Sequence, residues 1–246
     1  MTRLIRSSKI IPQVLRYSLY YCVYVIRETM HFRRLAVLLL ALCALPTTAA
    51  SQTLTYTTID VGGRLSVTVP SHWRVRDTAE RQNIAAGADA ALNPTGKSSE
   101  SMHVSSLSVV SNPEPIRAII RVSFVKEPGT QAELNREISA NKDKVVAELK
   151  TAWDAEKHQL AEGMARQGGQ YLGQEVFRIE TIGTRTALVV SYKRSSLRGG
   201  APFIVTQYHV PMGSDKVLVT LSFQESEAGL FRPILERVKN SISIYR

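Results

Sequence analysis

Cysteine is nearly absent from this chain of 246 residues. It occurs twice, at Cys22 and Cys43, and both positions precede the body of the chain. From Gln52 onward the sequence therefore offers no disulfide framework, no thiolate nucleophile and no cysteine-ligated metal site. A body of about 195 residues is large enough to bury a hydrophobic core without such cross-links.

Short motifs for catalysis and metal binding are missing as well. No histidine pair has the spacing H-x-x-x-H or H-E-x-x-H, and G-x-S-x-G does not occur. We therefore predict no cofactor, no metal and no catalytic residue from local motifs. Two long-range arrangements stay open: a cluster of His72, His103 and His209, and an acid/base pair of carboxyl groups.

One segment matches a relaxed Walker A pattern. Residues 91–98 read ALNPTGKS, with alanine in place of the first glycine. A phosphate-binding loop needs a buried strand before it and a helix after it. Here a polar, alanine-rich stretch precedes the segment and the polar run SSES follows from Ser98. We interpret the segment as a loop and predict no nucleotide.

The longest apolar run lies near the start and predicts export. Residues 30–51 combine Arg33 and Arg34, an apolar run over residues 35–45, and small residues up to Ser51. This order is typical of a cleaved secretory signal peptide, and the run is too short for a membrane-spanning helix, which needs about 20 residues. We therefore predict a periplasmic or secreted protein that begins near Gln52.

Residues 1–29 precede this signal, which normally works from the N-terminus. We therefore predict that translation starts at Met30 and that residues 1–29 are a mis-assigned upstream extension. The alternative is a cytoplasmic tail with a retained leader, which would attach the protein to a membrane.

Removal of the leader changes the charge balance of the chain. The whole chain has a formal net charge of +10, but the first 51 residues hold seven basic residues and one acidic residue, which leaves +4 for residues 52–246. No stripe of lysine and arginine with interleaved aromatics appears in those residues, so the sequence predicts no nucleic-acid partner.

Hydrophobic periodicity predicts a single α+β domain over residues 52–246. Alternation indicates strands at 54–59, 65–69, 102–110, 116–125, 175–182, 185–194, 203–210 and 216–223. A short helix is expected near 78–86, a long amphipathic helix over 131–167 and a C-terminal helix over about 230–242. We expect a largely antiparallel sheet that buries one face under the two amphipathic helices.

Several segments in this order resemble the PsbP-like superfamily. They are VPSHW at 69–73, GTRTA at 183–187, YHVP at 208–211 and PIL at 233–235, and the likeness covers residues 54–245. This superfamily includes photosystem II extrinsic proteins, Mog-type proteins and bacterial envelope proteins of the DcrB type. The stretch 77–101 has no counterpart, and the helix over 131–167 is longer than in the family.

The resemblance implies partner binding or assembly without a shared catalytic residue. We therefore predict an exported, non-catalytic binding or accessory protein of the bacterial envelope, and we name His72 and Trp73 as candidate binding residues because they stand at a strand-to-loop corner. Trp73 has an alternative role as a cap on the core. The alternative function is an envelope hydrolase with an acid/base site outside known motifs.

Overall fold

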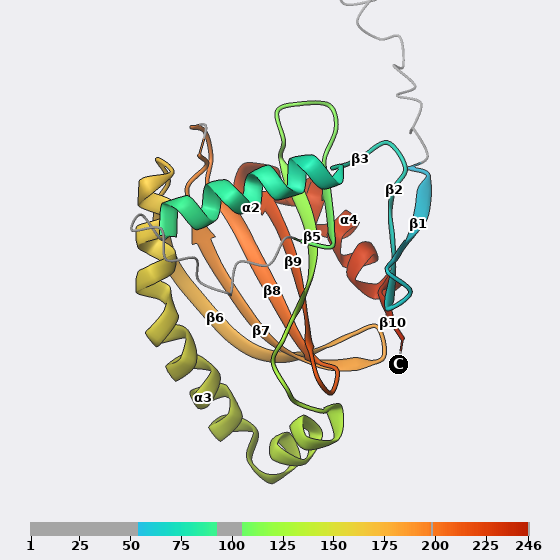
Figure 1. Cartoon of the computed structure of the whole chain (residues 1–246), viewed down its shortest axis with the longest axis vertical. Coiled ribbons are helices and arrows are strands. Elements are labelled where there is room, and N and C mark those ends of the chain that lie inside the picture. Colours follow the sequence, from blue (N-terminus) through green and yellow to red (C-terminus); the bar gives the residue numbers. More distant parts are fainter. Residues whose placement is uncertain (1–53, 93–104, 198, 246) are drawn as a thin grey trace, which may run out of the picture. The chain divides into compact units, whose positions relative to one another are not determined.

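The computed structural model describes residues 54–92, 105–197 and 199–245 (Figure 1). The predicted signal peptide (30–51) and upstream extension (1–29) lie outside the described residues. The described part contains three α-helices and one short 3-10 helix: α2 (Thr78–Leu92), α3 (Gln131–Arg166), η1 (Glu225–Glu227) and α4 (Ala228–Ser241). Within this part, no helix is long and apolar enough to cross a membrane.

The larger sheet has seven strands in the order β3-β4-β5-β9-β8-β7-β6, and each neighbouring pair is antiparallel. Strands β6 to β9 follow one another in the chain and pair in that order, so they form an antiparallel meander. The strands are β3 (Arg74–Val75), β4 (Leu107–Val110), β5 (Ala118–Val125), β6 (Tyr171–Ile182), β7 (Arg185–Arg194), β8 (Phe203–Pro211) and β9 (Lys216–Gln224). The predicted α+β class with a largely antiparallel sheet is therefore confirmed.

A smaller sheet pairs β1 (Tyr56–Val61) with β2 (Leu65–Pro70), and β2 in turn pairs with β10 (Ser243–Ile244). The β1–β2 hairpin turns at Gly62 and Gly63, which have φ angles of 64° and 65° that favour glycine. The side chain of Asp60 accepts a hydrogen bond of 2.7 Å from the Gly63 amide and stabilises this turn.

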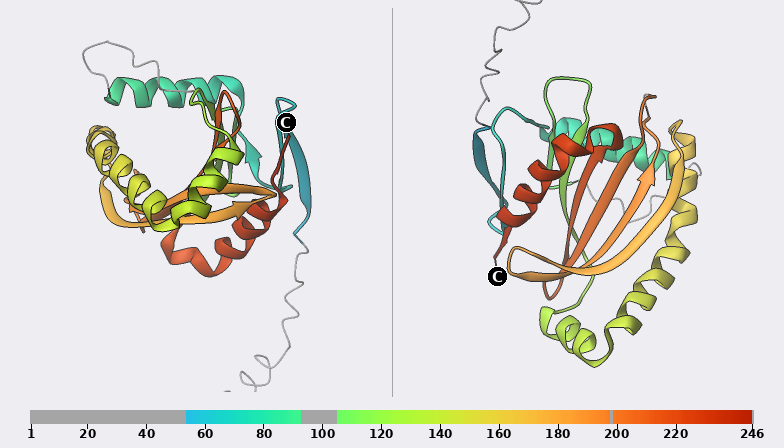
Figure 2. Two further views of the ribbon diagram at one scale, coloured as in Figure 1. Left: turned by 90° about the horizontal axis from the view of Figure 1, so that it is seen from below. Right: turned by 180° about the vertical axis from the view of Figure 1, so that it is seen from behind.

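The main core lies on the convex face of the larger sheet, where α4 packs against β9 and β2 (Figure 2). The stripe of α4 contributes Phe231, Ile234, Leu235 and Val238, each under 9% exposed. The facing residues of the strands include Val189 and Val219, which are fully buried. Every second residue of these strands thus points to the convex face and contributes to one apolar layer, as expected for one face of a pleated sheet.

The long helix α3 lies on the opposite, concave face, on the same side as α2 (Figure 2). Trp153 of α3 packs there with Val190, Tyr192 and Val205. The expectation that both amphipathic helices cover one face is therefore wrong. Strands β7 and β8 carry apolar residues at both parities, so each face of the sheet needs its own cover.

The two edges of the larger sheet are irregular. Strand β3 at one edge has two residues. Strand β6 at the other edge has register shifts between Tyr171 and Val176, and within them Gln174 takes a φ of 59°, in the left-handed region that is uncommon for residues other than glycine. The pairing of β6 with β7 is therefore irregular at the start of β6 and regular from Val176 onward.

Candidate functional site

A cavity of about 590 Å³ lies between α3 and the concave face of the sheet. We call it the α3 cavity. Its inner wall is apolar, because Leu134, Val145 and Trp153 of α3 and Val190 of β7 are all under 9% exposed. It is lined by Glu127, Pro128, Gly129, Thr130, Glu133, Leu134, Glu137, Val145, Glu148, Leu149, Ala152, Trp153, Glu156, Leu188, Val190, His209, Pro211 and Lys216.

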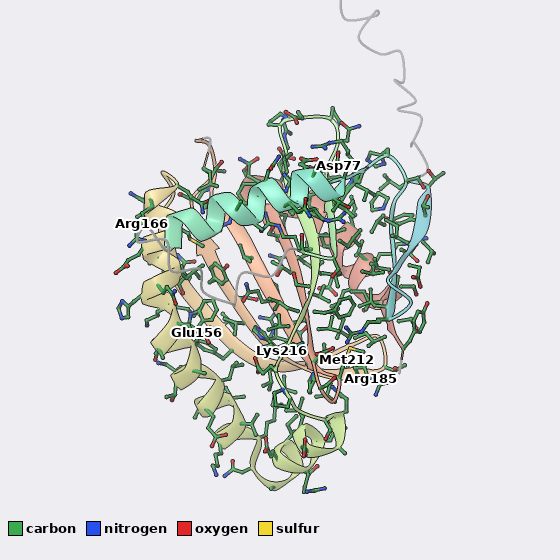
Figure 3. The ribbon with its side chains drawn as sticks, in the orientation of Figure 1. Asp77, Glu156, Arg166, Arg185, Met212 and Lys216 are labelled. Carbon is green, nitrogen blue, oxygen red and sulfur yellow. The ribbon has the colours of Figure 1, made fainter. Side chains whose placement is uncertain are left out.

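The opening of the α3 cavity is acidic. Five exposed glutamates line it, against a single lysine among the lining residues: Glu127, Glu133, Glu137, Glu148 and Glu156 against Lys216. Lys216 forms an ion pair with Glu127, so it is already compensated. Figure 3 shows Glu156 on α3 and Lys216 at the start of β9. The field at the opening therefore favours positively charged groups.

Glu133 has a structural role beside this charge. It completes a capping box with Thr130: its amide donates to the Thr130 hydroxyl at 3.1 Å, and its carboxylate accepts from the Thr130 amide at 2.9 Å. The hydroxyl and amide of Thr130 lower the pKa of Glu133. Its carboxylate therefore stays ionised at neutral pH and adds to the acidic opening.

His209 of β8 is a polar residue in the wall of the cavity. Its Nε2 atom is buried and has no hydrogen-bond partner within the described part of the chain. Burial, and secondarily the charge of Lys216, lowers the pKa of His209 to about 3. The imidazole is therefore neutral at physiological pH, and one ring nitrogen is left without a partner beside the cavity.

A kink in α3 shapes the cavity wall. Asn141 has φ −163° and ψ 94°, outside the helical range, and its side chain accepts a hydrogen bond of 3.0 Å from the Lys144 amide. This is the geometry of an N-cap, so the helix restarts at this point. Because of the bend, Leu134 before it and Val145 after it both line the cavity.

The first turn of α3 is held at the end of the meander by Gln131. Its side-chain amide donates to the carbonyl of Thr186 at 2.9 Å and to that of Pro211 at 3.3 Å. Its carbonyl oxygen accepts from the Thr186 amide at 2.9 Å. One side chain thus satisfies backbone groups of both β7 and β8 and fixes the lower end of the cavity.

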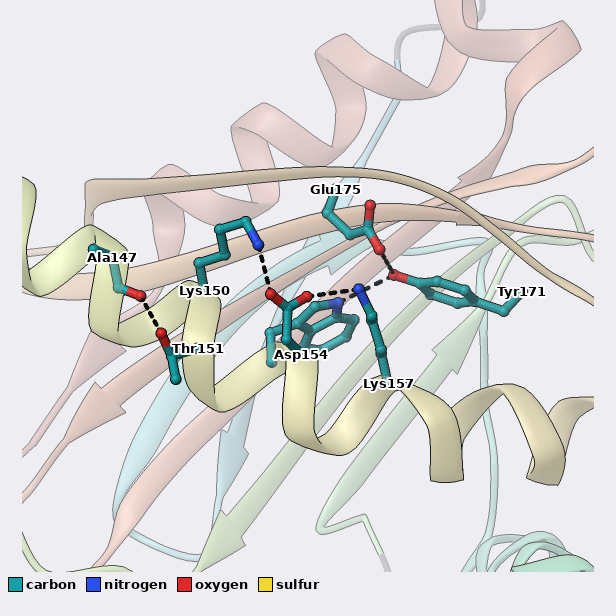
Figure 4. Close-up of polar contacts among 8 residues, drawn as sticks. Ala147, Lys150, Thr151, Asp154, Lys157, Tyr171 and Glu175 are labelled. Carbon is teal, nitrogen blue, oxygen red and sulfur yellow. Dashed lines mark hydrogen bonds and ion pairs between the residues drawn. The ribbon is translucent and has the colours of Figure 1, made fainter.

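Farther along α3, a polar network fastens the helix to β6 (Figure 4). The Trp153 indole donates to the Tyr171 hydroxyl at 3.1 Å, and that hydroxyl donates to Glu175 at 2.6 Å. The rings of Trp153, Tyr171 and Tyr192 also pack together, with centroids 5.1 to 6.5 Å apart. This network holds Trp153 at the cavity wall while it satisfies the indole N–H.

Neither candidate residue at the strand-to-loop corner lines the α3 cavity. Trp73 is 5% exposed and packs edge-to-face on Phe231 of α4, with ring centroids 6.0 Å apart. His72 is exposed. The structure thus places Trp73 in the main core and leaves His72 at the surface, so the two side chains do not converge on one site.

The other sequence-based candidates give no site in the described residues. No group of three metal-ligating side chains occurs among them, and His103 lies outside them. Of the Walker-like segment, residues 91 and 92 are described, and they end helix α2. A helix therefore precedes the segment where a phosphate-binding loop would need a strand.

No protein-family model matches the sequence, and no curated protein matches it. Solved structures similar to this chain include cyanobacterial PsbP of Synechocystis, at 12% identity and a TM-score of 0.42, over 82% of this chain and 99% of that one. The Saccharomyces cerevisiae Ran-binding protein Mog1p is 10% identical, with a TM-score of 0.37, over 78% and 96%. A Bacteroides thetaiotaomicron protein is 12% identical, with a TM-score of 0.40, over 76% of this chain, which spans 47% of that protein's length. These likenesses concern the fold alone.

Proposed function

We propose that this chain is an exported, non-catalytic binding or accessory protein of the bacterial envelope. Its α3 cavity would hold a basic, amphipathic segment of a partner protein. The observation that carries the proposal is the combination of an apolar inner wall with an opening lined by five glutamates.

The geometry supports an apolar side chain inside and cations at the opening. Buried Leu134, Val145 and Trp153 offer an apolar surface. The cavity volume of about 590 Å³ lies within the range of about 300 to 1,000 Å³ that is typical of ligand pockets. Glu137 and Glu156 have no ion-pair partner in the described residues, so an incoming lysine or arginine meets carboxylates that are not already neutralised. Complementary charge of this kind speeds association and selects the partner.

Peptide binding tests the cavity directly. The probe is a synthetic amphipathic helix of leucine and lysine, and its comparison peptide has glutamate in place of lysine. Trp153 lines the cavity, so its fluorescence is expected to respond to the basic peptide, and the response is expected to weaken as salt is added.

A charge-neutralised variant gives the matched comparison. Glu137→Gln combined with Glu156→Gln is expected to weaken binding of the basic peptide by about tenfold. Glu162→Gln is the control, because Glu162 lies on the same helix but does not line the cavity. Equal binding of the acidic peptide, or equal losses in both variants, would reject the proposed use of the cavity.

Export is tested separately, by N-terminal sequencing of the protein from its natural host. A chain that begins at Gln52 in the envelope or medium supports the proposed processing. A cytosolic chain that still carries residues 30–51 contradicts it, whatever the peptide experiment shows.

A further inference from the structure

A polar row crosses the concave face of the sheet outside the α3 cavity. Ser108 of β4 lies directly opposite Arg121 of β5, and Arg121 lies opposite Thr220 of β9. The residues on either side of Arg121, Ile120 and Val122, belong to the main core on the convex face. Because side chains alternate along a strand, Arg121 lies on the concave face, the side that carries α2 and α3 (Figure 2).

Two arginines of this face lack a counter-ion among the described residues. Arg121 has no hydrogen bond or ion pair to any of them. Arg194 of β7 lies over the Phe203 ring, 4.7 Å from its centroid, and donates to the Ser195 carbonyl at 3.0 Å, but it meets no carboxylate there. Burial, then the positive charges of Arg76 and Arg194, lowers the pKa of Arg121 to about 10.

Such an arrangement is costly for the part of the chain that the structure describes. Arg121 is only partly exposed, and a cation withdrawn from water without an anionic partner is destabilising. The neighbouring hydroxyl adds to the imbalance, because Ser108 is 2% exposed and its Oγ has no hydrogen-bond partner in the described residues. Burial raises the pKa of Tyr192 to about 12, although the positive charges of Arg194 and Arg121 act to lower it. The Tyr192 hydroxyl therefore keeps its proton and remains a hydrogen-bond donor.

We propose that Arg121 and the Ser108 hydroxyl, which lie opposite each other on neighbouring strands, form a binding site for an oxyanion, either a carboxylate or a phosphate group, and that Arg194 adds positive charge to the same face. A planar guanidinium offers paired N–H donors that match the two oxygens of such a group, and a serine hydroxyl adds a further donor. The bound anion would supply the missing counter-charge. This site is separate from the α3 cavity and stands independently of the proposed function, since Ser108, Arg121 and Arg194 do not line that cavity.

Thermal unfolding of the purified protein tests the site. Inorganic phosphate and acetate are titrated against sodium chloride at matched ionic strength. The melting temperature of the wild-type protein is expected to rise with phosphate or acetate and to stay level with chloride, because a ligand of the folded state stabilises it by mass action. Equal effects of all three salts would overturn the proposal.

Substitutions locate the effect. Arg121→Met is expected to abolish the anion-dependent rise while it unfolds at the same or a higher temperature than the wild type without anion, since it removes a partly buried charge that has no counter-ion in the described residues. Ser108→Ala is expected to weaken anion affinity by about tenfold. The control is Arg232→Met, on the exposed face of α4. Retention of the rise in Arg121→Met, or a lower melting temperature of Arg121→Met without anion, would show that Arg121 has a purely structural role.

A sedimentation arm separates two sources of the anion. Vesicles with phosphatidylglycerol are compared with vesicles of phosphatidylcholine alone. Sedimentation with the anionic vesicles that is lost in Arg121→Met would assign the site to a lipid headgroup. A response to phosphate or acetate without sedimentation would assign it to a free anion, and the absence of both would overturn the proposal.

Discussion

Replacement of His209 with glutamine is expected to reduce the loss of folding stability as the pH falls from about 7.5 to about 5. In the folded chain, burial lowers the pKa of His209 from 6.5 to about 3. In the unfolded chain the imidazole is solvated and takes up a proton near its ordinary pKa. The unfolded state therefore binds more protons than the folded state between these two values, so His209 destabilises the fold as the pH falls through that interval.

The free-energy penalty from His209 depends on how far the pH lies below the pKa of the histidine in the unfolded chain. At a pH of about 5, roughly 1.5 units below that pKa, the penalty is about 2 kcal/mol. It disappears above the unfolded pKa and grows until the pH reaches the folded pKa. Glu133 and Glu175 have lowered pKa values in the folded chain, so their protonation in acid also reduces the stability of the fold. Both proteins contain them, so their contribution cancels in the comparison.

Urea denaturation at the two pH values measures the effect. His209→Gln is expected to lose about 2 kcal/mol less than the wild type on acidification. The control is His158→Gln, which makes the same side-chain change at an exposed position of α3. Equal slopes in His209→Gln and the wild type, or a His209 resonance that titrates near the ordinary histidine pKa in the folded protein, would refute the reasoning.

Three further predictions concern stability, and urea denaturation measures each of them. Asn141→Ala removes the cap at the kink of α3 and is expected to cost about 1 kcal/mol; no loss would mean that the kink does not depend on this side chain. Gly183→Ala is expected to cost several kcal/mol, because a Cβ there would lie 2.1 Å from a backbone oxygen, whereas Gly87→Ala in α2 meets nothing within 4 Å and is expected to stabilise the fold by up to about 1 kcal/mol. Trp73→Ala is expected to cost about 3 to 5 kcal/mol and His72→Ala less than about 0.5 kcal/mol; similar losses in both would contradict a core position for the tryptophan alone.

Strong periodicity made most of the fold predictable. Strand β7 has the predicted bounds, and the strands predicted at 203–210 and 216–223 are each one residue longer. The helix predicted near 78–86 extends to Leu92. Its amphipathic pattern is weak, so the sequence did not indicate where the helix ends. Where local pattern and tertiary packing favour the same state, the sequence is sufficient.

Features that depend on distant contacts were missed. Strand β10 has two residues and exists because Ile244 pairs with Leu65, and so short a segment shows no alternation. The kink at Asn141 had a usable signal, since asparagine followed by Asp143 is typical of a helix N-terminus, but the continuous apolar stripe favoured one straight helix.

The cavity was missed for a related reason. The amphipathic pattern of α3 predicts glutamates outside its apolar stripe, but their common position at one opening arises from the bend and from the approach of β7 and β8. The sequence offers His209 only as a member of an open cluster with His72 and His103, because its burial depends on the helix that covers that face. Sequence spacing within one element does not reveal what a second element covers.

The irregular ends of the larger sheet bear on how the protein behaves at high concentration. An open edge with a regular row of amide and carbonyl groups is a template on which a second copy can add its own strand and begin an aggregate. Here β3 offers two residues, and the bulged segment of β6 interrupts that row near Gln174. The two edges of the larger sheet are therefore poor templates for edge-to-edge growth between copies of this chain.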